Sequence, residues 1–408
     1  MEPHKHSSVE TDYLQEAVLD ASIQFPHALS KNALNPKGVF LTGVTGLLGA
    51  YLLDELLHKT QALVYCLVRA ETKELAGQRL IKHMQAYGLW QPALAHRVIA
   101  MAGDVAQPRF ALSETQFQEL AEQVDVIYHS AGLINMRYSY ARLKPTNVLG
   151  VVEGLRLAGL VKTKPFHFVS SIAVFYSDAH PPHLTLHESD VPQFHPGLKG
   201  DYGKSKWVAD RLVAAAQARG LPACIYRPTR IMGHSRTGAL NDTRELLPRV
   251  VKGCIQMGAY PDWDIDVTWV PVDYVSRTMV HVASKPQAFG QAFHLFNPAP
   301  IPWRVLMDNL HNLGYALQEI PHEQWRQELR HHATHNSAVD QADKAFYAAL
   351  MMAFTGLHYL FHQRPPFDAA QTLAVLADSG ISCPPIDPAL IAVYVAYWQK
   401  NGFLPAPA

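Results

Sequence analysis

Tyr202 and Lys206 are the two residues of this chain whose type and spacing point most directly to chemistry. They are four positions apart, so a helix places them on one face. Tyrosine is a weak acid with a pKa near 10. A lysine ammonium about 4 Å away stabilises its anion by on the order of 4 kcal/mol at an effective dielectric constant of 20. Tyr202 could then protonate an oxyanion formed by hydride attack on a carbonyl, and Lys206 could also hold a nicotinamide ribose.

A Ser-Ser pair supplies a candidate third catalytic group. Ser171 follows a predicted strand at residues 166–170, and its hydroxyl is expected to donate a hydrogen bond to the same carbonyl oxygen. A Tyr-x-x-x-Lys pair and a Ser-Ser pair each occur by chance in many chains. Their order here, behind a glycine-rich turn, favours a catalytic site over a coincidence.

The glycine-rich turn at residues 43–49 lies between a predicted strand at 39–42 and a predicted helix at 50–57. In a dinucleotide fingerprint, Gly43 allows the tight turn, Gly46 lets the backbone approach a pyrophosphate, and Gly49 lets helix and sheet pack closely. The helix N-terminus then offers N–H groups to the phosphates. The cofactor-binding positions predicted here are Gly43, Thr45, Gly46, Leu47, Leu48 and Gly49.

Arg69 indicates which nicotinamide is bound. It stands twenty residues past Gly49, at the end of a predicted strand at 63–68, where an NAD enzyme usually places an acidic residue against the ribose hydroxyl. A guanidinium instead suits the 2′-phosphate of NADP, and Arg79 could add a second contact. Asp104 and Val105 are expected beside the adenine. NADPH is the predicted cofactor.

The order of the predicted elements positions these residues. Five uninterrupted apolar runs rich in β-formers alternate with helical stretches, which predicts a doubly wound α/β domain with a parallel sheet buried on both faces. The predicted strands are residues 39–42, 63–68, 98–102, 124–129 and 166–170.

Three segments are expected along the chain. Residues 1–37 form an N-terminal helical preface, and residues 38–300 form the NADP-binding Rossmann domain. Within it, residues 236–267 are expected to contribute to the substrate side. After Ile301 the strands are predicted to stop, and residues 301–408 form a smaller, mainly helical C-terminal subdomain that binds substrate. Its helices are predicted at residues 303–314, 324–334, 338–354 and 387–400.

Composition limits the class of protein. Hydrophobic residues make up 48% and charged residues 17% of 408, which supports a large core and argues against disorder. Lys+Arg and Asp+Glu are equal at 35 each, so neither nucleic acid nor a membrane surface is an expected partner. Four scattered cysteines fit a reducing cytosol. With no signal-peptide pattern and no membrane-length apolar run, the expected location is cytoplasmic.

A metal site is not expected. Among His331, His332 and His335, the first and the last are four residues apart and would share one helix face, but no third ligand or acidic partner has suitable spacing. No coiled coil or interface motif indicates an obligate oligomer, so a monomer is expected.

These motifs resemble the extended branch of the short-chain dehydrogenase/reductase superfamily. More narrowly, the chain is similar, nearly end to end, to the thioester reductase domains that terminate nonribosomal peptide and polyketide assembly lines, and to the reductase domain of carboxylic acid reductases. The glycine turn and the Tyr/Lys pair are shared across the superfamily. The segments that are specific to the narrower family are residues 204–207, 269–274 and 402–405.

The resemblance implies roles for particular residues. Ser171 occupies the family's Ser/Thr position, Tyr202 that of the acid and Lys206 that of its partner. The cofactor would also be lined by Ser130, Ala131, Gly132, Asn147, Pro228 and Ile231. Residues 129–132 read His-Ser-Ala-Gly where the family commonly has His-Asn-Gly-Ala, and Thr229 stands where relatives often carry glycine. The second departure puts the shape of the nicotinamide pocket in doubt.

The activity implied is NADPH-dependent reductive release of an acyl or peptidyl thioester as an aldehyde, with further reduction to an alcohol left open. The implied partner is a phosphopantetheinyl carrier protein or domain, bound by the C-terminal subdomain. Three alternatives remain: a fatty acyl-CoA reductase, a sugar-nucleotide epimerase or dehydratase, and a redox-inactive NADP-binding protein. Arg69 argues against the second alternative, and Tyr202 with Lys206 against the third.

Overall fold

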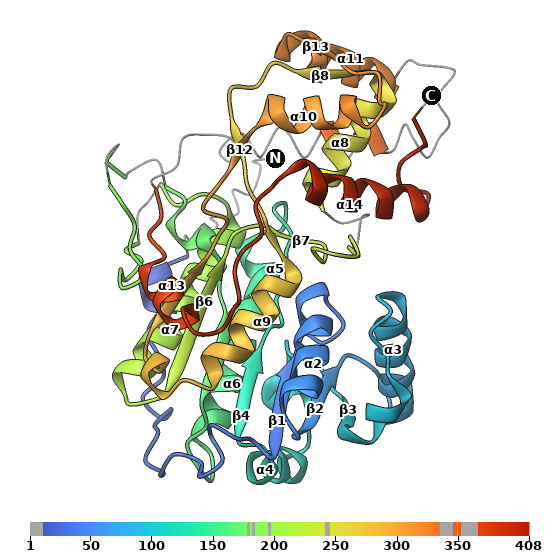
Figure 1. The fold of residues 1–408 in the computed structure, drawn as a ribbon. Coiled ribbons are helices and arrows are strands. Elements are labelled where there is room, and N and C mark those ends of the chain that lie inside the picture. The colour runs from blue at the N-terminus through green and yellow to red at the C-terminus, as the bar shows by residue number, and fades with distance from the viewer. Residues whose placement is uncertain are drawn as a thin grey trace, which may run out of the picture.

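A seven-stranded, all-parallel sheet forms the centre of the computed structural model (Figure 1). The structure describes residues 11–177, 180–181, 184–194, 197–240, 245–334, 346–348, 350–351 and 366–407. The strand order is β11-β6-β5-β4-β1-β2-β3. The strands are β1 (Gly38–Thr42), β2 (Leu63–Val68), β3 (Val98–Ala102), β4 (Val126–His129), β5 (Phe166–Val169), β6 (Ala223–Pro228) and β11 (Ala292–Leu295).

The order reverses between β1 and β4, which is where doubly wound sheets bind their ligands, at the carboxyl ends of the strands. The predicted Rossmann fold is confirmed. All five predicted strands are present, with β4 starting at Val126 rather than residue 124 and β5 ending at Val169 rather than residue 170. Strands β6 and β11 were not among the predicted ones.

Helices cover both faces of the sheet because the strands are apolar on both sides. In β1, Val39 and Leu41 belong to one core cluster and Phe40 to the other. On the Phe40 face lie α4 (Glu114–Gln123), α6 (Gly150–Gly159) and α7 (Asp201–Ala218). On the opposite face lie α2 (Leu47–Lys59), α3 (Lys73–Ala86) and α9 (Val272–Ala283). We call the sheet with these helices the Rossmann unit.

A separate hydrophobic core is built by elements that lie above the Rossmann unit in Figure 1. It buries four tryptophans, Trp269, Trp303, Trp325 and Trp398. The elements around it, which we call the upper unit, are α8 (Leu246–Met257), β8 (Ala259–Pro261), β9 (Asp266–Val267), β12 (Ile301–Pro302), α10 (Trp303–Asn312), β13 (Gln318–Ile320), α11 (His322–Thr334) and α14 (Pro388–Lys400).

Three of the four predicted C-terminal helices correspond to α10, α11 and α14, with ends shifted by up to two residues. The prediction that strands stop after Ile301 is wrong, because β12 pairs with β9 and β13 pairs with β8. Both are two or three residues long, too short to leave a period-2 pattern. Of the helix predicted at 338–354, the described residues 346–348, 350 and 351 are helical; the remainder lies outside the described residues.

The two units are joined by several chain crossings. Helix α13 (Ala370–Leu376) belongs to the C-terminal third of the sequence, yet it packs on α9 and β11 of the Rossmann unit. The chain then runs up to α14 in the upper unit (Figure 1). Residues 246–267 likewise pack in the upper core, although the chain reaches the upper unit from β6.

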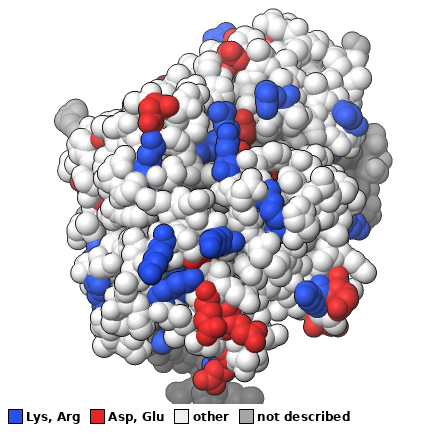
Figure 2. Space-filling model, turned by 60° about the horizontal axis from the view of Figure 1, so that its bottom comes forward, with Lys and Arg blue, Asp and Glu red and all other residues white. Residues whose placement is uncertain are grey.

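Short elements complete the described structure: α1 (Tyr13–Glu16), η1 (Pro92–Arg97), η2 (Pro108–Ala111), α5 (Tyr140–Lys144), η3 (Pro145–Leu149), η4 (Ile172–Phe175), β7 (Ile231–Met232), β10 (Val270–Pro271) and η5 (Pro286–Ala288). Among the described helices, none combines the length and the apolar character needed to cross a bilayer. Figure 2 shows Lys and Arg interspersed with Asp and Glu on the face drawn there.

Candidate active site

The turn between β1 and α2 has the geometry of a dinucleotide-binding turn. Gly43 has φ +78°, and a Cβ there would lie 2.6 Å from the Ala131 nitrogen, so only glycine fits against the loop after β4. A Cβ on Gly49 would lie 2.0 Å from the Gly43 oxygen. Gly46 is exposed and precedes α2 without any side-chain cap. The first N–H groups of α2 are therefore open to a phosphate, and the residues present fit a nicotinamide dinucleotide.

The other predicted residues of this turn lie around those N–H groups. Thr45 is half-buried in the turn, and Leu47 and Leu48 open α2. Leu48 is buried in the Rossmann unit, whereas Leu47 packs against both the Rossmann core and the upper core. The cofactor turn is thus in contact with both units. His83, which the sequence did not single out, places its Nε2 3.3 Å from the Gly46 oxygen.

Arg69 and Arg79 lie together at the end of β2. Arg69 is exposed directly after the strand, and the Arg79 guanidinium donates a hydrogen bond to the Arg69 carbonyl (2.8 Å). Asp104 follows β3, and its Oδ1 accepts from the Ala106 N–H (3.0 Å). Val105 backs onto α6, since a Cβ on Gly150 would lie 2.8 Å from its oxygen. The strand ends of this half of the sheet thus present two cations and one carboxylate to the same edge.

The loop after β4 carries Ser130, Ala131 and Gly132. The Ala131 N–H donates to Thr42 Oγ1 (3.2 Å), and a Cβ on Gly132 would lie 3.4 Å from Lys206 Nζ. This loop therefore runs between the glycine turn and the Tyr/Lys helix.

Asn147 holds that loop in place. It lies in the π-helical segment η3, is 1% exposed, and its side chain accepts from the Leu133 N–H (2.7 Å). Its amide group donates to the Leu133 oxygen (3.1 Å) and to Ser205 Oγ (3.0 Å). Both amide protons are used within the protein, so the side chain positions the loop. Its predicted contact with the cofactor stays a prediction.

Tyr202 and Lys206 stand one turn apart on α7, close to the end of β5. Tyr202 is buried in a small apolar cluster with Leu143 and Ala173. Lys206 Nζ donates to the Val169 oxygen (2.8 Å) and lies 5.2 Å from the centre of the Phe168 ring. Burial lowers the pKa of Lys206 to about 8, a shift that the Asp210 carboxylate opposes. The lysine is consequently still charged at neutral pH.

Ser171 caps the short helix η4 directly after β5. Its Oγ accepts from the Ala173 N–H (3.2 Å), and η4 packs on α7, where a Cβ on Gly203 would lie 3.2 Å from the Ala173 oxygen. The structure therefore brings the Ser171 segment against the first turn of the helix that carries Tyr202.

Pro228 and Ile231 flank the end of β6. Pro228 is the last residue of the strand, and Ile231 begins β7, which pairs with β10. Thr229, between them, donates its backbone N–H to the Leu295 oxygen (2.9 Å). These residues lie at the carboxyl edge of the sheet, as do the glycine turn, Ser171 and the two arginines.

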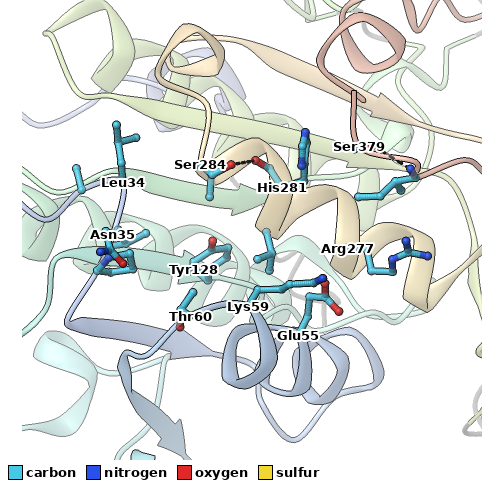
Figure 3. A pocket seen from close by; sticks show the side chains of 16 residues that line it. Leu34, Asn35, Glu55, Lys59, Thr60, Tyr128, Arg277, His281, Ser284 and Ser379 are labelled. Atoms are coloured by element: carbon cyan, nitrogen blue, oxygen red, sulfur yellow. Dashed lines mark hydrogen bonds between the residues drawn. The ribbon is translucent and has the colours of Figure 1, made fainter. Parts of the chain in front are cut away.

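A cavity of about 310 Å³ lies at the opposite, amino edge of the sheet (Figure 3). Lys59 near the end of α2, His281 near the end of α9 and Val126 at the start of β4 line it. None of the predicted site residues does. Within the described ranges no group of three or more His, Cys, Asp or Glu could hold a metal ion; His331 and His332 lie in the last turn of α11, and His335 lies outside the described residues.

A parallel doubly wound sheet, a glycine turn at its switch point and a Tyr-x-x-x-Lys helix at the same edge define a nicotinamide-dependent oxidoreductase of the extended short-chain dehydrogenase/reductase type. Residues 41–279 match the NAD-binding family described as Male sterility protein. The chain is 38% identical to the terminal R domain from the myxalamid PKS-NRPS biosynthetic pathway, whose crystal structure superposes with a TM-score of 0.90 over 97% of this chain and 99% of that one. The chain belongs to this family of terminal reductase domains.

In the curated relatives, the region similar to this chain is one part of a larger protein. It is 37% identical to a linear gramicidin synthase polypeptide of Brevibacillus parabrevis, over 95% of this chain and 8% of that protein. It is 32% identical to the L-2-aminoadipate reductase large subunit of Penicillium chrysogenum, over 94% and 28% respectively. The chain thus spans less than a third of either relative. The family resemblance seen in the sequence is confirmed, as is a nicotinamide-dependent oxidoreductase; NADPH is the cofactor typical of the family.

Proposed function

We propose that the chain catalyses NADPH-dependent reductive release of an acyl or peptidyl group held as a thioester on the phosphopantetheine arm of a carrier domain. The observation that carries the proposal is the placement of Lys206. Its ammonium is buried one turn from Tyr202, anchored on the Val169 carbonyl and beside Gly132 in the loop after β4, which also packs against the glycine turn. A charge in this position favours proton donation by the tyrosine beside a bound nicotinamide.

The bound NADPH would supply the hydride to the thioester carbonyl carbon. Ser171 would donate a hydrogen bond to the carbonyl oxygen, and Tyr202 would transfer its proton to that oxygen as negative charge develops. The resulting thiohemiacetal then collapses. Its hydroxyl proton returns to the Tyr202 oxygen, the C–S bond breaks, and the thiolate of the arm leaves and takes up a proton. The product is an aldehyde and a free carrier thiol.

Arg69 and Arg79 support NADPH over NADH. Both are exposed, and the hydrogen bond from Arg79 to the Arg69 carbonyl holds the Arg79 guanidinium at the end of β2, where Arg69 stands. Two cations at this position suit a 2′-phosphate, and neither supplies the carboxylate that would accept a hydrogen bond from a free ribose hydroxyl.

The carrier and the acyl chain are assigned to the upper unit. We divide the chain, as expected from the sequence, into a preface (1–37), a Rossmann domain (38–300) and a C-terminal part (301–408). The packing of α8 with α10 and α14 supports a contribution of residues 236–267 to the substrate side, and α13 adds a C-terminal helix to the Rossmann unit. The upper unit meets the cofactor turn at Leu47, and this contact with the proposed cofactor site supports its assignment to the substrate side.

The test is oxidation of NADPH and of NADH with acyl-pantetheine thioesters, acyl-CoA and free aldehydes. We expect NADPH-dependent turnover of the thioesters, and loss of at least about 100-fold in kcat for Tyr202→Phe, because the proton donor is removed. Tyr128→Phe is the matched control, since Tyr128 is also buried but lines the cavity at the opposite edge. NADPH binding without oxidation by any thioester would refute the proposal, and a preference for acyl-CoA would favour a fatty acyl-CoA reductase.

A further inference from the structure

Asp210 is a buried carboxylate that the proposed chemistry does not use. It stands four residues after Lys206 and eight after Tyr202, so the three side chains share one face of α7. Asp210 is 0% exposed. A carboxylate is buried at high cost unless it has a counter-charge and hydrogen bonds, so its partners indicate what it does.

The first partner ties Asp210 to the end of β5. Ser170 Oγ donates a hydrogen bond to Asp210 Oδ2 (2.6 Å). Ser170 directly precedes Ser171, and its backbone N–H donates to the Tyr226 oxygen (2.7 Å). The carboxylate therefore holds the residue next to Ser171 from the side of the helix that carries Tyr202.

The second partner ties Asp210 to the end of β6. Arg227 donates from Nε to Asp210 Oδ2 and from Nη2 to Oδ1, both at 3.0 Å, and the two side chains are 3% and 0% exposed. This planar two-point contact fixes direction as well as distance. Arg227 Nη1 also donates to the backbone oxygens of Glu188 (3.3 Å) and Asp190 (3.2 Å). Arg227 directly precedes Pro228.

Asp210 also acts on the charge of Lys206. Burial lowers the pKa of Lys206, and the Asp210 carboxylate raises it again. Tyr202 stands one turn before Lys206 on the same helix, and His129 on β4 interacts with the ammonium electrostatically. Burial lowers the pKa of His129 to about 3, which keeps that ring neutral. Asp210 is thus a carboxylate that stabilises the charged form of Lys206.

We infer that Asp210 is a positioning residue of the reductase centre. It holds α7, with Tyr202 and Lys206, in one register with the carboxyl ends of β5 and β6 through its contacts with Ser170 and Arg227. The inference rests on the roles given to Tyr202 and Lys206 in the proposed function. It adds a residue that touches neither substrate nor cofactor and acts through its neighbours.

The experiment compares Asp210→Asn with the wild type, using an acyl-pantetheine thioester and the matching aldehyde as substrates between pH 6 and 10. We expect kcat to fall on the order of 100-fold, since small displacements of reacting groups cost this much. We also expect the pH above which kcat declines to move to a lower value, because the charge that raises the pKa of Lys206 is gone.

Ser170→Ala is the second variant, because Asp210→Asn leaves Arg227 buried without its counter-charge and can unfold the chain. Ser170→Ala keeps the ion pair and removes only the link to β5. We expect kcat to fall roughly tenfold with the pH profile unchanged. The matched controls are Asp125→Asn and Ser30→Ala. Asp125 is 1% exposed, accepts from Ser30 Oγ (2.7 Å) and pairs with Lys162 (2.8 Å) at the amino edge of the sheet.

The inference is overturned if Asp210→Asn folds and keeps the pH profile of the wild type with a kcat no lower than that of Asp125→Asn. If Asp210→Asn does not fold, a wild-type kcat for Ser170→Ala overturns it. A wild-type chain that reduces the aldehyde but no thioester refutes the proposed function while leaving both Asp210 readouts measurable on the aldehyde. If the wild-type chain reduces neither the thioester nor the aldehyde, the proposed catalytic roles of Tyr202 and Lys206 are refuted, and so is the inference about Asp210.

Discussion

The ammonium group of Lys206 determines how the candidate site responds to pH. Burial brings its pKa from 10.5 down to about 8, so the group is charged below that pH and neutral above it. Because only the charged form stabilises the Tyr202 anion, we predict a kcat that is level near neutrality and declines above about pH 8. Lys206→Arg should move the decline upward, since arginine stays charged. A kcat that is level to pH 10 in the wild type would contradict this role.

Gly49 provides a test of the close backbone packing in the cofactor turn. A Cβ there would lie 2.0 Å from the Gly43 oxygen, so we predict that Gly49→Ala lowers the free energy of unfolding by about 1–3 kcal/mol and weakens NADPH binding. Gly77→Ala in α3 is the control. No heavy atom lies within 4 Å of a Cβ there, and alanine should stabilise the helix by about 0.5–1 kcal/mol. Thermal melts with and without NADPH measure both; equal effects at the two glycines would exclude a steric role for Gly49.

The site residues that could be predicted from the sequence are those whose roles follow from their spacing over a few positions of the chain. Gly43, Gly46 and Gly49 repeat every three positions beside a strand, and Tyr202 and Lys206 lie one helical turn apart. His83 and Asp210 were missed because their contacts lie far away in the chain: His83 is 37 residues from Gly46, and Asp210 is 40 from Ser170. A signal for Asp210 does exist, since Tyr, Lys and Asp follow one another at intervals of four.

At the scale of elements, one buried carboxylate helps to attach α13 to the Rossmann unit. Glu188, 1% exposed, accepts hydrogen bonds from the backbone N–H groups of Gln371 (2.6 Å) and Thr372 (3.1 Å) and from the Thr372 hydroxyl. It also accepts from the His294 N–H on β11 (2.7 Å). The carboxylate therefore joins the first turn of α13 to the edge strand of the sheet.

We predict that Thr372→Val lowers the free energy of unfolding by about 1–3 kcal/mol, because Glu188 loses a buried donor and the shape of the side chain is kept. Burial already raises the pKa of Glu188, and loss of the hydroxyl should raise it further. Leu373→Ala is the control, as Leu373 lies beside Thr372 and is 64% exposed. Chemical denaturation measures both variants, and equal midpoints would show that the hydroxyl contributes nothing.

Three strands, β11, β12 and β13, were not predicted from the sequence, for physical reasons. β11 is four residues long and includes His294, so it shows no uninterrupted apolar run, although all but one of its residues are buried. β12 and β13 are two and three residues long. Such strands form because neighbouring elements supply the partner, not because their own sequence favours the conformation. The long buried strands β1 and β2 were predictable because they are apolar on both faces.

At the scale of the whole molecule, the C-terminal third supports both cores. Deleting residues 302–408 would remove α13 from α9 and β11 and leave Glu188 buried without its donors on that helix. We predict that this truncated chain neither folds cooperatively nor binds NADPH. Deleting residues 388–408 removes α14 from the upper unit alone, and NADPH binding should survive. Circular dichroism melts and NADPH fluorescence distinguish the two, and a truncated chain 1–301 that binds NADPH would contradict this view.

The route of the chain between the units limits how such a protein can be recombined. The upper unit is built mainly from two separate stretches, around residues 246–269 and 301–334, together with α14. Between α11 and α14, the chain returns to the Rossmann unit to form α13. No single crossover within the chain exchanges one unit and leaves the other whole. A chimera made to change the released product would have to graft several segments at once or exchange all of the described chain as one cassette. A single crossover therefore cannot separate the cofactor site from the upper unit.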